Sequence, residues 1–228
     1  GYQIQPNEIS VQEELEKALS TILRTEIKTT GAGRTDTGVH AKKMFAHFDF
    51  DGEISEKLVH QLNSFLPPSI AVKKIFEVKE DFHARFSAKY RTYEYYISLE
   101  KNPFSEKFAW QHWRKTLDVE KMNEACKILF EYEDFGSFAK VGADNKTNIC
   151  KIYHANWEQN GNELKFTISA DRFLRNMVRA IVGTMVEIGS GKLKPADLRN
   201  VIEAKNRGVA GTSAPAHALF LVDVGYDF

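Results

Sequence analysis

The first third of the chain carries apolar residues at helical spacing, followed by segments in which apolar and polar residues alternate. The sequence Ser-Val-Gln-Glu at residues 10–13 is a capping-box pattern, which predicts the start of a helix. The apolar face of this helix consists of Val11, Leu15, Ala18, Leu19 and Ile22. After it the pattern predicts a strand, a strand, a helix and a strand, near residues 26–30, 44–50, 55–65 and 70–78.

The rest of the chain repeats this order, with a strand in front of the first helix. The predicted elements are a strand over residues 85–99, a helix from Asp118, strands over 149–158 and 163–171, a helix over 173–189 and a strand over 219–226. The order β-α-β-β-α-β is the split ferredoxin-like pattern. We therefore expect an α+β fold of two ferredoxin-like halves, residues 1–84 and 85–228, with antiparallel sheets and a central cleft. The first strand of the N-terminal half is expected to be missing from this sequence.

Composition narrows the class of protein. The 228 residues are 43% hydrophobic, and 31 basic residues balance 31 acidic ones, which argues against a generic nucleic-acid coat protein but leaves room for a local basic groove. Cys126 and Cys150 are too few for a disulfide framework or a thiolate zinc site. Without a signal-peptide pattern or a membrane-spanning apolar run, a soluble, cytoplasmic protein is expected.

Residues 31–41, Gly-Ala-Gly-Arg-Thr-Asp-Thr-Gly-Val-His-Ala, concentrate glycine and charge in one connection. A dinucleotide fingerprint is excluded because Asp36 stands where its third glycine is required, and its charge would repel pyrophosphate. The spacing of His40 and His47 matches no standard metal-ligand set, so we expect no metal there. The simplest role of Asp36 is that of a turn residue bonded to its own backbone, and a catalytic role remains the alternative.

Two stretches combine cations with aromatic rings or helical spacing. One face of the strand predicted from residue 85 would carry Arg85, Ser87, Lys89, Arg91, Tyr93 and Tyr95. Cations beside stacking rings suit a single-stranded or flipped base, and an ordinary solvated sheet face explains the pattern equally well. Arg172, Arg175 and Arg179 would share one side of the helix predicted over 173–189, which by itself favours a solvated face.

These pieces together resemble the tRNA pseudouridine synthase A family from the first residue to the last. The family sequence G-R-T-D-A-G-V-H is similar to residues 33–40, in which Thr37 is the only change. The other matching motifs are H-A-R-F-S-A at 83–88, Y-x-Y at 93–95, M-V-R-x-I-V-G at 177–183 and A-P-A-x-x-L-x-L at 214–221. The start, G-Y-Q-I-Q, resembles the family's G-W-Q-x-Q, which implies that the strand before it is absent here.

The resemblance implies isomerisation of uridine to pseudouridine in the anticodon stem-loop of tRNA, at positions 38–40, by a homodimer without cofactor or catalytic metal. Asp36 would be the nucleophile, and Tyr93 the ring that contacts the target base. Arg179 would pair with Asp36, and Leu219 would pack beneath the base, in a catalytic cleft between the halves. Thr37 departs from the family sequence beside the expected nucleophile, and the expected chemistry is the same.

Several points stay open at this stage. Arg34 would bind phosphate or replace the extruded base, and Arg85 would bind substrate. Whether Asp36 attacks the sugar C1′ or the uracil ring is not decided by the sequence. The rival from another class is a non-catalytic RNA-binding module, because paired sheets with basic and aromatic faces bind RNA without chemistry. A chain without its leading strand that binds RNA but does not turn over is a third possibility.

Overall fold

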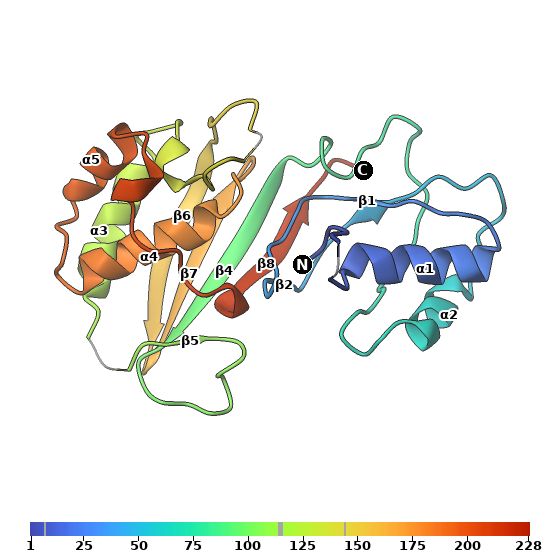
Figure 1. Ribbon diagram of the computed structural model, residues 1–228, viewed down its shortest axis with the longest axis horizontal. Helices are drawn as coiled ribbons and strands as arrows, with labels where there is room; N and C mark the ends of the chain where they lie inside the picture. The colour runs from blue at the N-terminus through green and yellow to red at the C-terminus, as the bar shows by residue number, and fades with distance from the viewer. Residues whose placement is uncertain (7, 114–115, 144) are drawn as a thin grey trace. The chain divides into compact units, whose positions relative to one another are not determined.

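The computed structural model describes residues 1–6, 8–113, 116–143 and 145–228. The chain divides into two compact units (Figure 1). The first unit contains Gly1–Thr37, Met44–Ala88 and Tyr226–Phe228, and the second contains Gly38–Lys43 and Lys89–Gly225. The chain therefore passes from the first unit to the second directly after Thr37. It returns to the first unit at Met44.

The second unit is built on a six-stranded sheet in the order β2-β8-β4-β7-β6, with β5 paired to β4. Its strands are β2 (His40–Ala41), β4 (Tyr90–Ser98), β5 (Trp110–Gln111), β6 (Ile152–Asn160), β7 (Glu163–Ala170) and β8 (Leu219–Gly225). The four long strands pair antiparallel, whereas β2 joins β8 and β5 joins β4 in parallel. A turn with Gly161 at φ +58° connects β6 to β7.

The described part of the second unit also contains the α-helices α3 (Val119–Leu129), α4 (Met177–Gly189) and α5 (Asp197–Glu203). They lie on one face of the sheet (Figure 1). Alternate residues of β7 are buried beneath them, as expected for a sheet with one covered face. Trp157 and Phe166 form a stacked pair in this core, with ring centroids 4.8 Å apart. Asp118 caps α3 by accepting from the Lys121 amide, so the predicted start of that helix is confirmed.

Two predicted boundaries in this region are wrong. The strand predicted over 85–99 begins at Tyr90, because residues 83–87 form a turn in which the Ser87 amide donates to the His83 carbonyl. The helix predicted over 173–189 begins at Met177, because Asn176 adopts a left-handed backbone conformation at φ +69°. Arg172 and Arg175 therefore lie before α4, and the predicted arginine stripe is not a helical face.

The first unit contains the helices α1 (Val11–Leu23) and α2 (Leu58–Phe65) and one small sheet, in which β1 (Thr30–Gly31) pairs antiparallel with β3 (Ala46–His47). Ser10 caps α1 by accepting from the Glu13 amide at 3.2 Å, as the capping-box pattern predicts. The apolar residues of the predicted strands still line the core with both helices: Ile27, Phe48, Phe50, Ile70, Val72 and Ile75. The whole chain is thus a mixed α/β protein with mainly antiparallel sheets.

The strands predicted in the first unit are shorter than expected, and residues 70–78, all of which are described, form none. Helix side chains take up the backbone groups instead. The amide group of Asn63 donates to the Val72 carbonyl and accepts from the Val72 amide, both at 2.7 Å. At Thr29 the backbone amide donates to Glu16 and the carbonyl accepts from Gln12. Because these groups are satisfied locally, no strand partner is required.

The end of the chain packs into the first unit through an aromatic cluster. Phe45, Phe76, Phe82, Tyr226 and Phe228 contact one another, and the Tyr226 hydroxyl donates to the Ala84 carbonyl.

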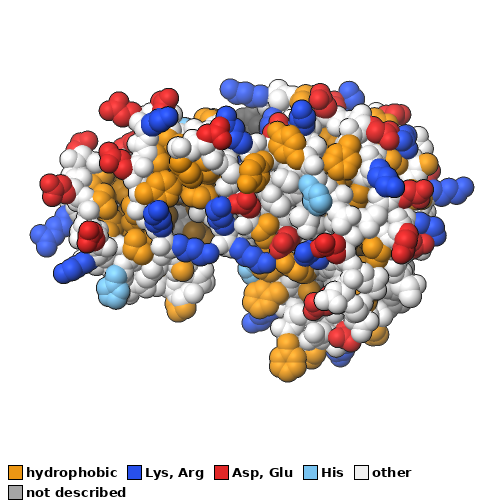
Figure 2. Space-filling view, turned by 180° about the vertical axis from the view of Figure 1, so that it is seen from behind, with side chains coloured by type: hydrophobic (Ala, Val, Ile, Leu, Met, Phe, Trp, Pro, Cys, Tyr) orange, Lys and Arg blue, Asp and Glu red, His pale blue; other side chains and the backbone are white. Residues whose placement is uncertain are grey.

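Acidic and basic side chains are interspersed over the face drawn in Figure 2, in keeping with the net charge of zero. No helix in the described part of the chain is long and apolar enough to cross a membrane.

Candidate active site

Asp36 lies in the loop that leaves the small sheet of the first unit. The loop begins where the Ala32 amide donates to the Phe45 carbonyl at 2.8 Å, next to the β1–β3 pair. Its far end is held by the start of the chain, since the Tyr2 amide donates to Thr35 and the Thr37 hydroxyl donates to Glu8. Between these anchors Asp36 is half-buried and Arg34 is exposed. The loop therefore fixes the backbone on both sides of Asp36 and leaves Arg34 at the surface.

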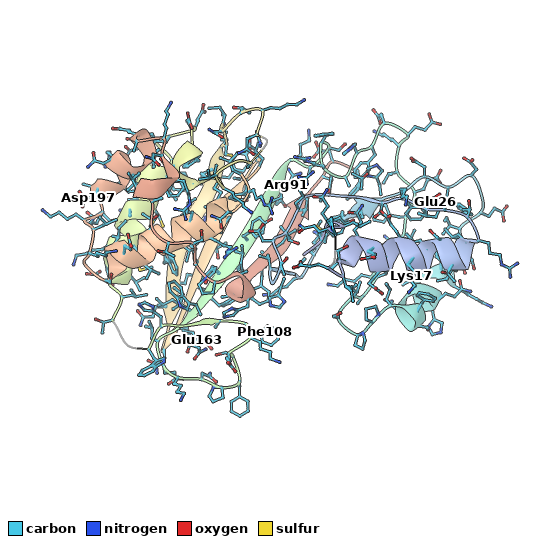
Figure 3. All side chains as sticks on the ribbon, viewed as in Figure 1. Lys17, Glu26, Arg91, Phe108, Glu163 and Asp197 are labelled. Carbon is cyan, nitrogen blue, oxygen red and sulfur yellow. The ribbon has the colours of Figure 1, made fainter. Side chains whose placement is uncertain are left out.

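Arg85 lies in the turn over residues 83–87 rather than on a strand face, so the predicted row of cations from Arg85 to Tyr95 is wrong as a single face. Its guanidinium lies over the ring of Phe86, 5.6 Å from the centroid, and both side chains are exposed. Farther along the chain, Arg91, which is labelled in Figure 3, donates to the Asp171 carbonyl. Tyr95 is fully buried. A turn followed by a half-buried strand breaks the alternation on which the prediction depended.

Two histidines shape the turn that carries Arg85. The Ala84 amide donates to His47 Nδ1, and the Arg85 amide donates to His83 Nδ1, each at 3.1 Å. The two rings lie 5.0 Å apart between centroids. Burial lowers the pKa of His47 below its ordinary value, and the charge that His83 would carry acts in the same direction. The folded protein therefore holds His47 as a neutral acceptor.

This arrangement predicts a loss of stability in mild acid. Because the pKa of His47 is lower in the folded than in the unfolded chain, the unfolded chain takes up the proton first as pH falls below about 6.5. Stability is complete above that pH and decreases as pH falls toward the folded pKa. We expect a lower melting temperature at pH 5 than at pH 7.5 by circular dichroism. His47→Asn keeps an acceptor but cannot titrate, so it should reduce the difference, whereas His60→Asn on the exposed face of α2 should not. If the melting temperature falls by the same amount between pH 7.5 and pH 5 in both variants, His47 does not have this role.

Tyr93 occupies the helix-covered side of β4 in the second unit. Its ring meets Phe173 edge-on, with centroids 5.2 Å apart, and it packs against the core while remaining half-buried. Its Cα partners are Ile168 on β7 and Leu221 on β8, and the pairing with β8 shifts register between Thr92 and Tyr93. Such an irregularity redirects a side chain relative to a regular ladder. The position combines a supported ring with access from solvent.

Arg179 projects from α4 and is held by the segment before β8. Its Nε donates to the Ala214 carbonyl at 2.7 Å, and the Ala214 amide donates back to the Arg179 carbonyl at 3.0 Å. That segment is itself bonded to α4, because the Gly211 amide donates to Thr184 Oγ1 at 2.9 Å. The guanidinium therefore has one fixed donor edge, which limits its rotamers.

Tyr95 is the residue around which the second unit gathers its predicted site residues. The Tyr95 hydroxyl donates to the Pro215 carbonyl at 2.9 Å, and burial raises the pKa of this phenol, which the charge of Arg179 opposes. Leu219, only 5% exposed, is the Cα partner of Tyr95 on β8. Arg179 and Leu219 thus lie beside one neutral, buried phenol, and Tyr93 precedes it by two residues on the same strand. Sequence reasoning placed Tyr95 on a binding face and missed this supporting role.

The structure brings the predicted residues into two groups. Tyr93, Arg179 and Leu219 belong to the second unit, and Asp36, Arg34 and Arg85 to the first. The described residues hold no group of three or more histidine, cysteine or acidic side chains placed to bind a metal ion. Cys126 and Cys150 are buried and unpaired, and burial raises the pKa of each thiol to about 12. Neither thiol is therefore set up as a nucleophile.

Known proteins resemble the chain along its whole length. Residues 125–227 match the family described as tRNA pseudouridine synthase. Arg179 and Leu219 lie inside the matched range, which places this part of the second unit in the class of pseudouridine synthases, and Tyr93 lies before it. The chain is 55% identical to tRNA pseudouridine synthase A of Parabacteroides distasonis and 56% identical to that of Bacteroides fragilis, over 99% of this chain and 90% of each relative. It is 40% identical to tRNA pseudouridine synthase A of Bacillus subtilis, over 100% of this chain and 94% of that protein.

The chain belongs to the tRNA pseudouridine synthase A family, a family of isomerases. The family resemblance recognised from its motifs is confirmed.

Proposed function

We propose that this protein converts uridine to pseudouridine in the anticodon stem-loop of tRNA, with Asp36 as the nucleophile. The observation that carries the proposal is the family sequence around Asp36 in a chain at least half identical to two proteins named tRNA pseudouridine synthase A. The second support is the group of Tyr93, Arg179 and Leu219 around Tyr95, which offers a ring, a cation and an apolar surface. A flipped base is held by stacking between aromatic and apolar side chains, and the cation suits the carboxylate.

The reaction sets the demands on these residues. The bond from uracil N1 to the sugar C1′ breaks, the ring turns, and C5 bonds to C1′, while the C5 proton is lost and N1 gains one. A carboxylate can hold one fragment covalently, through the sugar or through the ring. It must be ionised to attack, and a guanidinium favours the ionised form. In this proposal Asp36 attacks, Arg179 keeps it ionised, and Leu219 supports the base. Tyr93 stacks on the base and relays the C5 proton, passing its own hydroxyl proton on as it takes up the one from C5.

Further parts of the proposal concern substrate and assembly. Arg34 and Arg85, both exposed, are proposed to bind phosphates of the tRNA, since arginine contacts to phosphate position nucleic acid without reading sequence. tRNA positions 38–40, a homodimer and a cytoplasmic location follow from the family resemblance alone. The β4-α3-β6-β7-α4-β8 order and the sheet order β8-β4-β7-β6 support a ferredoxin-like second half. The division into residues 1–84 and 85–228 around a catalytic cleft stays a prediction.

The direct test is release of tritium from C5-labelled uridine in unmodified tRNA. An isomerase releases the label because C5 exchanges its hydrogen for the new bond to C1′. The alternative, a non-catalytic RNA-binding module, would bind the same tRNA and release none. Binding of this tRNA without tritium release would reject the enzymatic proposal.

Tyr93→Phe separates the stacking role of this residue from proton transfer. The variant keeps the ring and its edge-on contact with Phe173 but loses the hydroxyl. We expect kcat to fall about 100-fold, the lower end of what a positioned acid or base contributes, with KM changed less than about threefold. Single-turnover and steady-state tritium release give both constants. Full activity would leave Tyr93 as a stacking surface only.

A further inference from the structure

A cavity of about 550 Å³ lies in the second unit beside the start of β8. Its lining includes Gly38, His40, Glu106, Lys107, Trp110 and His217. None of these is among the residues assigned a role in the proposed reaction. The volume falls in the range of ligand-binding clefts, roughly 300–1,000 Å³, and is ample for one nucleotide base.

One wall of the cavity is rigid and has an unmet polar group. His40 pairs with Phe220 through the β2–β8 ladder, and its ring stacks on that of Phe220 with centroids 4.7 Å apart. Phe108 packs against the same imidazole at 5.3 Å. His40 Nε2 is shielded from water and has no hydrogen-bond partner among the residues that the structure describes. A buried polar group left without a partner is costly and calls for an explanation.

The other lining residues come mainly from the loop between β4 and β5, on which Figure 3 labels Phe108. Gln111 holds this loop, because its carbonyl oxygen accepts from the Asn102 amide at 2.8 Å and its amide nitrogen donates to Ser105. His217 Nε2 lies 3.3 Å from the Ala109 carbonyl and ties the end of the loop to the segment before β8. The rings of Trp110 and His217 are thus held in place while half-exposed.

The chemistry of the lining suits a nucleotide. Trp110 and His217 supply half-exposed aromatic rings, and base stacking on such rings does not depend on which base is bound. Lys107 supplies an exposed cation for a phosphate, and the neighbouring Glu106 an acceptor for a base amino group. A purely apolar ligand would leave both charges unused.

The position of the cavity along the chain indicates which nucleotide of the RNA it would bind. Gly38, in its wall, follows Asp36 by two residues, and consecutive Cα atoms are about 3.8 Å apart, so the two Cα atoms are separated by at most about 7.6 Å. Neighbouring nucleotides in a single strand are separated by a similar distance. A base bound in the cavity while a uridine is bound at Asp36 is therefore a neighbour of that uridine in the same RNA.

We propose that this cavity is a second base-binding site, which holds the nucleotide next to the target uridine and so helps to draw the target out of the stack. The inference depends on the proposed function for the identity of the RNA. It adds a binding contribution from a nucleotide that does not react.

The test is a double-mutant cycle between His217 and the neighbouring base. His217→Gln keeps a donor for the Ala109 carbonyl and removes the ring, so the loop should stay in place. Binding to an anticodon stem-loop RNA is measured by fluorescence anisotropy for the intact RNA and for RNAs made abasic on the 5′ or the 3′ side of the target uridine. We expect the variant to bind intact RNA about five- to tenfold more weakly, from the loss of one stacking contact. It should bind one of the two abasic RNAs as tightly as the unaltered protein binds that RNA.

The controls separate this inference from folding and from catalysis. His154→Gln makes the same substitution at an exposed position of β6 outside the cavity and should leave every Kd unchanged. An unchanged melting temperature shows that His217→Gln still folds. Equal weakening on the intact RNA and both abasic RNAs, or no weakening on any, overturns the second site. Pseudouridine formation by the unaltered chain tests the proposed function separately, because the cycle uses binding alone.

Discussion

Asp36→Asn yields a folded protein that binds tRNA and forms no detectable pseudouridine. The substitution is nearly isosteric, and an amide keeps the acceptor that a turn requires, so the melting temperature should stay within about 2 °C, in line with small effects of substitutions that bury nothing new. The amide cannot serve as a nucleophile in a covalent step. Loss of a nucleophile lowers kcat by many orders of magnitude in other enzymes, and we expect at least about a 1,000-fold loss of tritium release here.

The neighbouring residue provides the matched control for Asp36. Thr37 donates to Glu8 at 3.2 Å and is the only position at which residues 33–40 differ from the family sequence, which has alanine. Thr37→Ala should therefore remain active within a few-fold, although it changes the same loop. If Asp36→Asn keeps near-normal activity and only the stability falls, Asp36 is a turn residue and the nucleophile lies elsewhere.

The elements of the second unit could be predicted from the sequence because their patterns are long and find partners nearby. Strands β6 and β7 are joined by a turn with glycine at its centre, so each supplies the other's backbone partner. In the first unit the pattern predicted which side chains are buried but not the hydrogen bonding. Val72 and Thr29 lie in segments whose apolar and polar residues alternate as in a strand. Helix side chains nevertheless bond their backbone groups: Asn63 bonds Val72, and Gln12 and Glu16 bond Thr29. A single side chain that bonds the backbone in place of a neighbouring strand produces no periodic pattern in the sequence, so it could not be predicted.

Sequence motifs predicted the candidate site residues. They did not predict the structural features that hold those residues in place. Asp36, Tyr93 and Arg179 stand in three family motifs, whereas the register shift beside Tyr93 and the left-handed turn at Asn176 have no signal of their own. The burial of Tyr95 contradicts the simple alternation that put it beside Tyr93 on an open face. Residues of one strand face differ in exposure because helices cover only part of the sheet. Contacts between segments distant in the chain decide that coverage.

Arg179 is held by the segment before β8, and this segment packs against α4 at Gly183. We therefore expect a substitution at Gly183 to disturb the second unit most. A Cβ at Gly183 would lie 1.8 Å from the Thr212 carbonyl oxygen, and one at Gly211 would lie 2.7 Å from the Thr184 amide nitrogen. Helix α4 and the segment before β8 therefore touch backbone to backbone. Neither atom belongs to a side chain that can rotate away. The segment itself must shift, and with it the Ala214 carbonyl that holds Arg179.

Gly183→Ala should lower the free energy of unfolding by about 1–3 kcal/mol, the usual cost of overpacking, although alanine is favoured over glycine in a helix by about 1 kcal/mol. Because a shift of about 1 Å in a positioning group can cost about 100-fold, kcat should fall by that order at temperatures where the variant is folded. Urea unfolding and tritium release measure the two effects. Gly189→Ala on the same helix is the control, since its Cβ would meet the Met122 sulfur at 2.5 Å, an atom of a flexible side chain. If both variants are equally stable and active, the backbone contact at Gly183 does not position Arg179.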